Sequence, residues 1–176
     1  FLPFTCFSSH ELPHPDFKKV IYLVRDPRDA MASYYAMHKA MNVDCTLHEM
    51  IVEGKNILPC KWYKHIQAWL DNPYQANILI VKYEDLIEQP FIEMKRITSF
   101  LGLERSDEIL HKTIEGNRFE AMQQKEQIFG WNNKRFPQDQ KFVRKGKIGN
   151  YKTELPQDLI EYLEQEAAEQ LKYFKY

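Results

Sequence analysis

Residues 19–29 of this 176-residue chain read KVIYLVRDPRD, and they carry the strongest fold signal in the sequence. The first six form a β-branched and aromatic run with apolar residues on both faces, which is typical of a central strand in a parallel sheet. Asp26 suits the N-cap of a helix and Pro27 suits its first position, so we predict a helix from Arg28 to about Met41. A strand that leads directly into a capped helix begins a β-α-β unit.

The rest of the chain continues this order of strand and helix. A second buried strand is predicted over residues 77–83, and residues 117–148 are polar and irregular, so we expect a loop there. Helices are predicted at residues 58–70, 90–101, 106–115 and 156–174, with a shorter one after the capping box at 46–49. We therefore expect one α/β domain over residues 1–176, with a P-loop-NTPase-like parallel sheet flanked by helices. Such a sheet usually has more than two strands, so we expect the N-terminal strand and its loop to be missing from this chain.

The composition is that of an ordinary globular protein and excludes several classes. Hydrophobic residues make up 44% and charged residues 28%, and 24 Lys and Arg stand against 25 Asp and Glu. With a net charge of −1 there is no general basic field for nucleic acid, so a bound anion needs a local cluster of cations. The three cysteines lack the spacing of a zinc site or a disulfide framework, and no apolar run is long enough to cross a bilayer. We expect a cytoplasmic protein that binds neither metal nor nucleic acid, with no membrane span in this chain.

Arg25 lies at the carboxyl end of the first predicted strand, where open α/β sheets bind their ligands. Its planar guanidinium suits a phosphate or a carboxylate, and Ser33 follows it in the predicted helix. The alternative interpretation is structural, with Arg25 in a salt bridge to Asp29 and Ser33 on the helix surface.

Three further positions have the same double interpretation. The run Arg144-Lys145-Gly146 could surround a phosphate with cations and backbone N–H groups, or it could form a solvated charged turn. Tyr83 ends the second strand, where it could contact a ligand or pack in the core. His10 lies in a loop before the first strand, and an isolated histidine in such a loop is usually a surface residue.

In their order along the chain, these motifs resemble those of the cytosolic-type sulfotransferases, which use 3′-phosphoadenosine 5′-phosphosulfate (PAPS). That family has a strand ending in Arg-(Asp/Asn)-Pro-(Arg/Lys)-Asp, then Ser-Tyr-Tyr, Tyr-Glu-Asp and Arg-Lys-Gly-x-x-Gly-(Asp/Asn)-(Trp/Tyr)-Lys. This chain has RDPRD at 25–29, SYY at 33–35, YED at 83–85 and RKGKIGNYK at 144–152. Each motif alone is a weak or moderate signal, and their common order over residues 8–152 carries the resemblance.

The resemblance implies a binding site for PAPS and for its product, 3′,5′-adenosine bisphosphate (PAP). Arg25 and Ser33 would hold the 3′-phosphate of the nucleotide. Arg144, Lys145 and Gly146 would close over the same phosphate.

The resemblance also implies a pocket for the adenine base. Tyr83 would contact the adenine, and Phe119 and Met122 match the Phe and Met of a family motif that lines this pocket. Asn117 and Arg118 stand where that motif has hydroxyl residues, which is a departure from the family.

His10 matches the histidine of the family's Lys-Thr-His motif and would be the catalytic base. It would take a proton from a hydroxyl or amine of the acceptor, and the sulfuryl group would then pass in line from PAPS without a metal. Ser8 stands where many members have the lysine of this motif. The acceptor is expected to be a small molecule or a saccharide.

The family's phosphosulfate-binding loop, Pro-Lys-Ser-Gly-Thr-Thr-Trp, has no counterpart in this chain. We therefore expect the C-terminal majority of a sulfotransferase domain, and the alternative is a non-catalytic adenosine-bisphosphate-binding module or an inactive fragment. A P-loop kinase relative is disfavoured because no GxxxxGK[ST] motif occurs. Oligomers are possible, but not through the family's usual motif, because Pro156 and Gln157 stand where that motif has Thr-Val.

Overall fold

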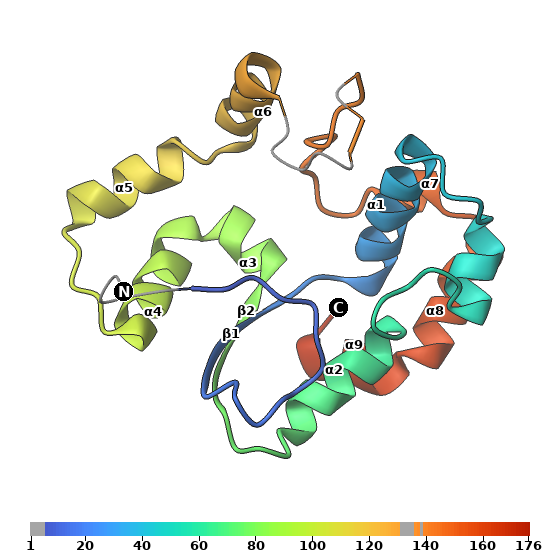
Figure 1. Cartoon of the computed structure of the whole chain (residues 1–176), viewed down its shortest axis with the longest axis horizontal. Helices are drawn as coiled ribbons and strands as arrows, with labels where there is room; N and C mark the ends of the chain where they lie inside the picture. Colours follow the sequence, from blue (N-terminus) through green and yellow to red (C-terminus); the bar gives the residue numbers. More distant parts are fainter. Residues whose placement is uncertain (1–5, 131–135, 138) are drawn as a thin grey trace.

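Two parallel strands lie at the centre of the computed structural model, which describes residues 6–130, 136–137 and 139–176 (Figure 1). Strand β1 (Lys19–Val24) pairs with β2 (Asn77–Lys82), with Lys19 opposite Asn77 and Val24 opposite Lys82. Both strands were predicted, and their carboxyl ends meet at one edge. Within the described part of the chain, these two strands make up the whole sheet.

Helices surround the strand pair (Figure 1). In chain order they are α1 (Pro27–Ala40), the π-helical turn η1 (Glu49–Glu53), α2 (Trp62–Asp71), α3 (Tyr83–Glu88), α4 (Pro90–Leu101), α5 (Asp107–Glu115), α6 (Phe119–Phe129), α7 (Tyr151–Glu154), α8 (Gln157–Glu166) and α9 (Ala168–Phe174). In the described residues, no helix has the length and apolar character that crossing a membrane requires.

Several helix boundaries follow the capping signals in the sequence. Asp26 caps α1 by accepting a 2.9 Å hydrogen bond from the backbone N–H of Arg28, and Pro27 takes the first helical position. Thr46 and Glu49 form the reciprocal bonds of a capping box before η1. These local signals were sufficient to predict where the two helices begin, because each signal acts over only a few residues.

The structure corrects the predicted loop at residues 117–148, because α6 occupies part of it. This helix has no buried residue, so its sequence lacks the apolar periodicity by which a helix is recognised. The predicted helix 156–174 is divided at Ala167, and β2 ends one residue early because Tyr83 begins α3.

Two apolar clusters fix the helices around the strands. One packs α1 and η1 against α8, and its buried residues include Met31, Met50, Ile51, Leu159 and Leu163. The other joins β1, α2 and α9 through Val24, Ile66 and Phe174. Each fully buried side chain of this size contributes about 1.5–3 kcal/mol, so these contacts hold the strand ends and α1 in place.

Candidate functional site

The carboxyl ends of β1 and β2 bring Arg25 and Tyr83 together. The Arg25 guanidinium lies over the Tyr83 ring, 4.5 Å from its centre, as in a cation–π contact. The indole N–H of Trp62 donates a 3.1 Å hydrogen bond to the Arg25 carbonyl. Buried Glu84 accepts a 3.1 Å bond from the backbone N–H of Asp26, which joins the two strand ends.

Asp29 is 2% exposed and links this edge to a distant loop. Its Oδ2 accepts a 2.6 Å hydrogen bond from the backbone N–H of Gly149, and its Oδ1 accepts one of 2.9 Å from that of Tyr151. The predicted ion pair with Arg25 is present but long, at 3.9 Å between Nη2 and Oδ2. Asp29 therefore serves mainly as an acceptor for backbone N–H groups.

Arg25 keeps a donor that the described residues do not use. Its Nε is buried and has no hydrogen-bond partner within that part of the chain. A buried N–H without a partner costs free energy, and an anion beside the guanidinium would satisfy it. This atom is an observation in favour of an anion site at the end of β1.

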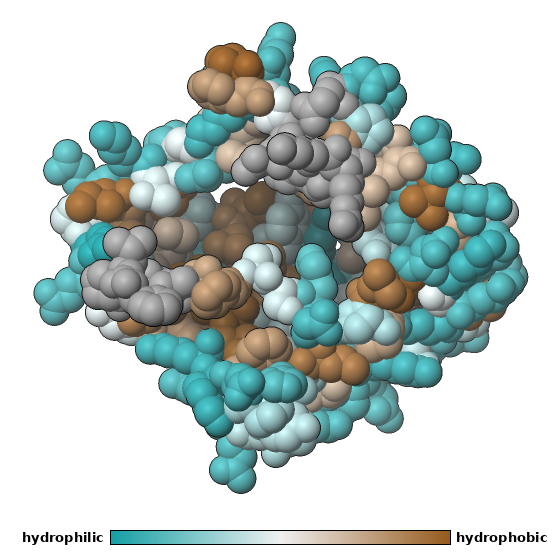
Figure 2. Space-filling view, viewed as in Figure 1, coloured by the Kyte–Doolittle hydropathy of each residue, from teal (hydrophilic) through white to brown (hydrophobic). Residues whose placement is uncertain are grey.

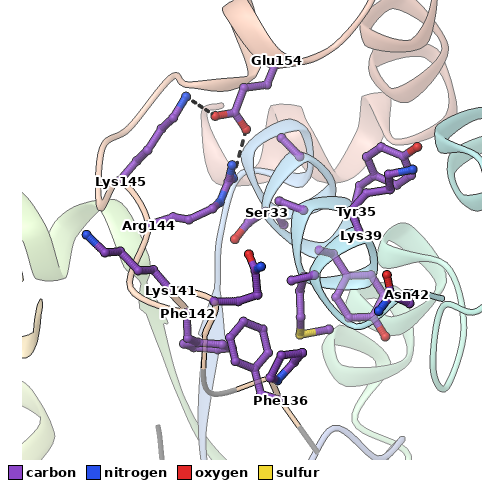
Figure 3. Close-up of a pocket in the computed structure, with 18 of the residues that line it drawn as sticks. Ser33, Tyr35, Lys39, Asn42, Phe136, Lys141, Phe142, Arg144, Lys145 and Glu154 are labelled. Carbon is purple, nitrogen blue, oxygen red and sulfur yellow. Dashed lines mark hydrogen bonds and ion pairs between the residues drawn. The ribbon is translucent and has the colours of Figure 1, made fainter. Parts of the chain in front are cut away.

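Arg144 and Lys145 share one carboxylate, that of Glu154 in α7 (Figure 3). Arg144 Nη2 lies 3.1 Å from Glu154 Oε2, and Lys145 Nζ contacts Oε1. Burial alone would favour the neutral acid, but the hydrogen bonds from Lys145 and Arg144 outweigh it and lower the pKa of Glu154. The Arg-Lys-Gly run is therefore more than a solvated turn, because both of its cations are held by a partly buried anion.

A cavity of about 1060 Å³ opens between α1 and the loop before α7. Five predicted site residues line it, namely His10, Arg25, Ser33, Arg144 and Lys145. Figure 3 shows Ser33 on α1 together with Arg144 on the facing loop. Figure 2 shows the molecule hollowed on this face, with apolar residues at the floor of the hollow. Cations, a hydroxyl and an imidazole from separate parts of the sequence thus face one space.

Helix α6 holds the loop that precedes α7. Its Glu126 carboxylate accepts bonds of 2.6 and 3.0 Å from the backbone N–H groups of Phe142 and Val143. Phe119 packs on Gly146, where a Cβ atom would lie only 2.2 Å from the ring. The φ angle of Gly146 is +60°, so glycine is favoured there for both conformation and space.

Four predicted residues lie outside the lining of the cavity. Tyr83 contacts Arg25, and Gly146 is bonded to Lys145; Arg25 and Lys145 both line the cavity. Phe119 in turn packs on Gly146. Met122 lies one turn further along α6 and is half-buried. The structure therefore brings His10, Arg25, Ser33, Arg144 and Lys145 to one cavity, and of the predicted adenine residues Tyr83 contacts Arg25 and Phe119 contacts Gly146.

Sequence reasoning missed the anionic and positioning members of this site. Glu154 follows the Arg-Lys-Gly run without a recognisable spacing, and Glu126 lies in α6, within the predicted loop 117–148. His65 of α2 contacts the His10 segment, yet its neighbours form an ordinary amphipathic stripe. Only Asp29 had a signal, its position four residues after Arg25.

A model of the sulfotransferase domain family matches residues 9–175. The chain belongs to the sulfotransferase family. The 3-alpha-hydroxysteroid sulfotransferase of Cavia porcellus is 31% identical over 146 residues, which cover 76% of this chain and 49% of the relative. Cytosolic sulfotransferase 1 of Danio rerio is 32% identical over 147 residues, with 76% and 47% covered. This sulfotransferase chain thus spans about half the length of the curated relatives it matches.

Solved structures share the fold of this sulfotransferase chain. Retinol dehydratase, in a complex with androsterone and the inactive cofactor PAP, has a TM-score of 0.72 at 24% identity and is matched over 90% of this chain and 48% of its own. The mouse sulfotransferase SULT7A1 complexed with PAP has a TM-score of 0.70 at 22% identity, and the match covers 88% of this chain and 58% of the mouse protein. The predicted family and the predicted α/β fold are confirmed.

Proposed function

We propose that this chain belongs to an enzyme that transfers the sulfuryl group of PAPS to a hydroxyl or amine of a small-molecule acceptor. One observation carries the proposal: Arg25, whose buried Nε has no hydrogen-bond partner among the described residues, lines the same cavity as Arg144, Lys145 and His10. The phosphates of an anionic nucleotide would pair with Arg25, Arg144 and Lys145, and His10 would lie beside the nucleotide as a base. The PAP in the two similar structures supports this nucleotide, since each was solved with PAP.

Each predicted residue has a role that its position supports. Arg25, Ser33, Arg144 and Lys145 would bind the 3′-phosphate, because their charged and hydroxyl groups face the cavity. Gly146 would let the loop pass closely over Phe119, which with Tyr83 and Met122 would contact the adenine.

His10 would act as the general base of the transfer. The imidazole would take the proton of the acceptor hydroxyl while the oxygen forms a bond to sulfur. The bond between sulfur and the bridging phosphate oxygen would break, and PAP would leave with that electron pair. The chain's own contribution is to position the donor, hold the charge of the leaving nucleotide and accept the proton.

The aromatic lining of the cavity supports an acceptor with apolar character. Tyr34, Tyr35, Phe136 and Phe142 line the same cavity as the cations. The name of the Cavia porcellus relative and the androsterone in the retinol dehydratase complex point to steroids for those proteins. A cytoplasmic location, the absence of metal, and any oligomeric state stay predictions.

A second candidate is a nucleotide-binding module without turnover. It is favoured by Ser8, which replaces the lysine of the family's histidine motif. Calorimetric titration with PAP, beside 5′-AMP as control, tests the nucleotide site shared by both candidates. Binding that depends on the 3′-phosphate is expected, and equal binding of the two ligands would overturn the phosphate assignments.

Transfer of ³⁵S from labelled PAPS to a phenol or steroid alcohol separates the two candidates. We expect the His10→Ala variant to lose transfer while its PAP affinity stays within about twofold. PAP binding without any transfer by the unmodified chain would favour the binding module.

A further inference from the structure

The segment that carries His10 is bound to α2 by two side chains one helical turn apart. The Nε2 atom of His65 lies 3.1 Å from the carbonyl oxygen of His10. The indole N–H of Trp69 donates a 3.2 Å hydrogen bond to the carbonyl of Glu11. The His10 side chain itself is exposed and lines the cavity. The main chain of this exposed loop is therefore held at two successive carbonyls.

The hydrogen bonds fix the tautomer of His65. A carbonyl oxygen only accepts, so Nε2 of His65 carries the proton and donates to His10. Nδ1 of the neutral ring is then an acceptor, and the Tyr22 hydroxyl lies 2.7 Å from it. Burial raises the pKa of Tyr22, which keeps that hydroxyl protonated and able to donate. A directed chain of bonds runs from Tyr22 of β1 through His65 to His10.

Ring contacts support these hydrogen bonds: Tyr22 packs on His65 and on Trp69, and Trp69 packs on the loop. The Tyr22 ring lies 5.7 Å from the His65 ring and 5.6 Å from the Trp69 ring, measured between centres. Phe17, further along the same loop, stacks on Trp69 at 6.2 Å. The His65 ring is therefore held by Tyr22, with its Nε2–H directed at the His10 carbonyl.

We propose that His65 is a positioning residue for His10, which it holds at the cavity through the His10 carbonyl. The inference rests on the proposed role of His10 as the base. A base must lie within hydrogen-bond reach of the proton it accepts, and an error of about 1 Å costs about 100-fold in rate. An exposed loop without these contacts would place the imidazole in many positions.

The test compares His65→Ala and His65→Gln with the unmodified chain, and uses His48→Ala, an exposed histidine before η1, as the matched control. Glutamine retains an N–H donor near the position of Nε2, whereas alanine removes it. In His65→Ala we expect kcat for sulfuryl transfer to fall about 10- to 100-fold, with PAP affinity unchanged. His65→Gln should recover most of this loss, and His48→Ala should match the unmodified chain.

A second readout does not depend on activity. In ¹⁵N relaxation experiments, residues 9–12 should be ordered in the unmodified chain and in His65→Gln, and mobile in His65→Ala. Unchanged order of these residues in His65→Ala would overturn the inference, as would an equal loss of kcat in both variants. If the unmodified chain transfers no sulfuryl group, the proposed function fails, and the relaxation measurement alone supports or overturns the role of His65.

Discussion

The carboxylate of Asp29 accepts a 2.6 Å hydrogen bond from the backbone N–H of Gly149, 120 residues further along the chain. One end of this bond belongs to the helix that follows β1, and the other to the loop that carries Arg144 and Lys145. The same carboxylate lies 3.9 Å from Arg25. Asp29 thus sets the position of the cationic loop relative to the end of the strand.

Replacing Asp29 by asparagine should weaken both folding and nucleotide binding. The amide oxygen can accept one of the two backbone hydrogen bonds, and the amide N–H₂ group would face the other donor. An unsatisfied buried donor costs about 1–3 kcal/mol, so we expect a lower free energy of unfolding in urea and weaker PAP binding in calorimetry. Asp158→Asn, at an exposed position of α8, is the control and should change neither. Equal behaviour of the two variants would contradict this role of Asp29.

Arg25→Ala should lower PAP affinity more than 5′-AMP affinity. The variant removes the guanidinium whose Nε has no partner in the described residues, and a hydrogen bond between charged groups is worth about 1.5–3 kcal/mol, or about 10- to 100-fold in Kd. Titration calorimetry with both nucleotides measures the difference. Arg105→Ala, at an exposed position before α5, serves as the control. Unchanged PAP affinity in Arg25→Ala would remove Arg25 from the phosphate site.

Glu154→Gln should bind PAP more tightly than the unmodified chain. At neutral pH the carboxylate is charged, because the hydrogen bonds from Lys145 and Arg144 lower its pKa, and it would compete with the proposed phosphate for both cations. A partly exposed ion pair is worth up to about 1 kcal/mol, so we expect a gain of about two- to fivefold in affinity. Glu169→Gln, at an exposed position of α9, is the control. Weaker binding in Glu154→Gln would show instead that this carboxylate prepares the cations for the ligand.

Gly146→Ala and Gly149→Ala separate a steric requirement from a conformational one. Both glycines have positive φ, +60° and +79°, so either substitution strains the backbone by about 1 kcal/mol. A Cβ at Gly146 would lie 2.2 Å from the Phe119 ring, whereas no described atom lies within 4 Å of one at Gly149. We therefore expect a larger loss of PAP affinity in Gly146→Ala. Equal losses would mean that the packing of Phe119 on this loop has no part in binding.

The stability of the protein should fall as the pH drops through the range in which His65 titrates. Burial lowers the pKa of His65 below its ordinary 6.5, and charge on His10 acts in the same direction, against the backbone hydrogen bonds. The unfolded chain then binds more protons than the folded one at pH values between the lowered pKa and 6.5. The stability that neutral His65 contributes to the folded state is therefore fully present above pH 6.5 and is lost as the pH falls toward the lowered pKa. Urea titrations over this range should show a smaller pH dependence for His65→Gln, and an identical dependence would contradict the assignment. Buried His38, whose pKa is also lowered by burial, contributes with the same sign in both proteins.

The sequence predicted those parts of the fold and the site that depend on neighbours along the chain. β1, the cap at Asp26 and the capping box at Thr46 are local patterns, and the structure has all of them. The gathering of Arg25, Ser33 and the Arg-Lys-Gly run could be predicted only through the family resemblance, because their contacts span large separations.

The parts that sequence reasoning missed depend on long-range contacts or on weak patterns. The sequence of α6 has no apolar periodicity that would predict a helix. Its contacts with the rest of the protein include those of Phe119 and Glu126 and do not form an apolar stripe. His65 and Trp69 lie on one helical stripe, which indicates packing and says nothing of the carbonyl groups they bind.

The parallel pairing of β1 and β2 has a consequence for how the chain folds. The strand ends meet through Asp26 and Glu84, 58 residues apart, and the loop of Arg144 joins this edge through the bonds from Gly149 and Tyr151 to Asp29. Contacts between such distant residues require long loops to close first, which slows the later stages of folding relative to helix formation. In a refolding experiment, helical circular dichroism should therefore return before the ability to bind a nucleotide. We therefore expect the proposed ligand-binding cations to come together last.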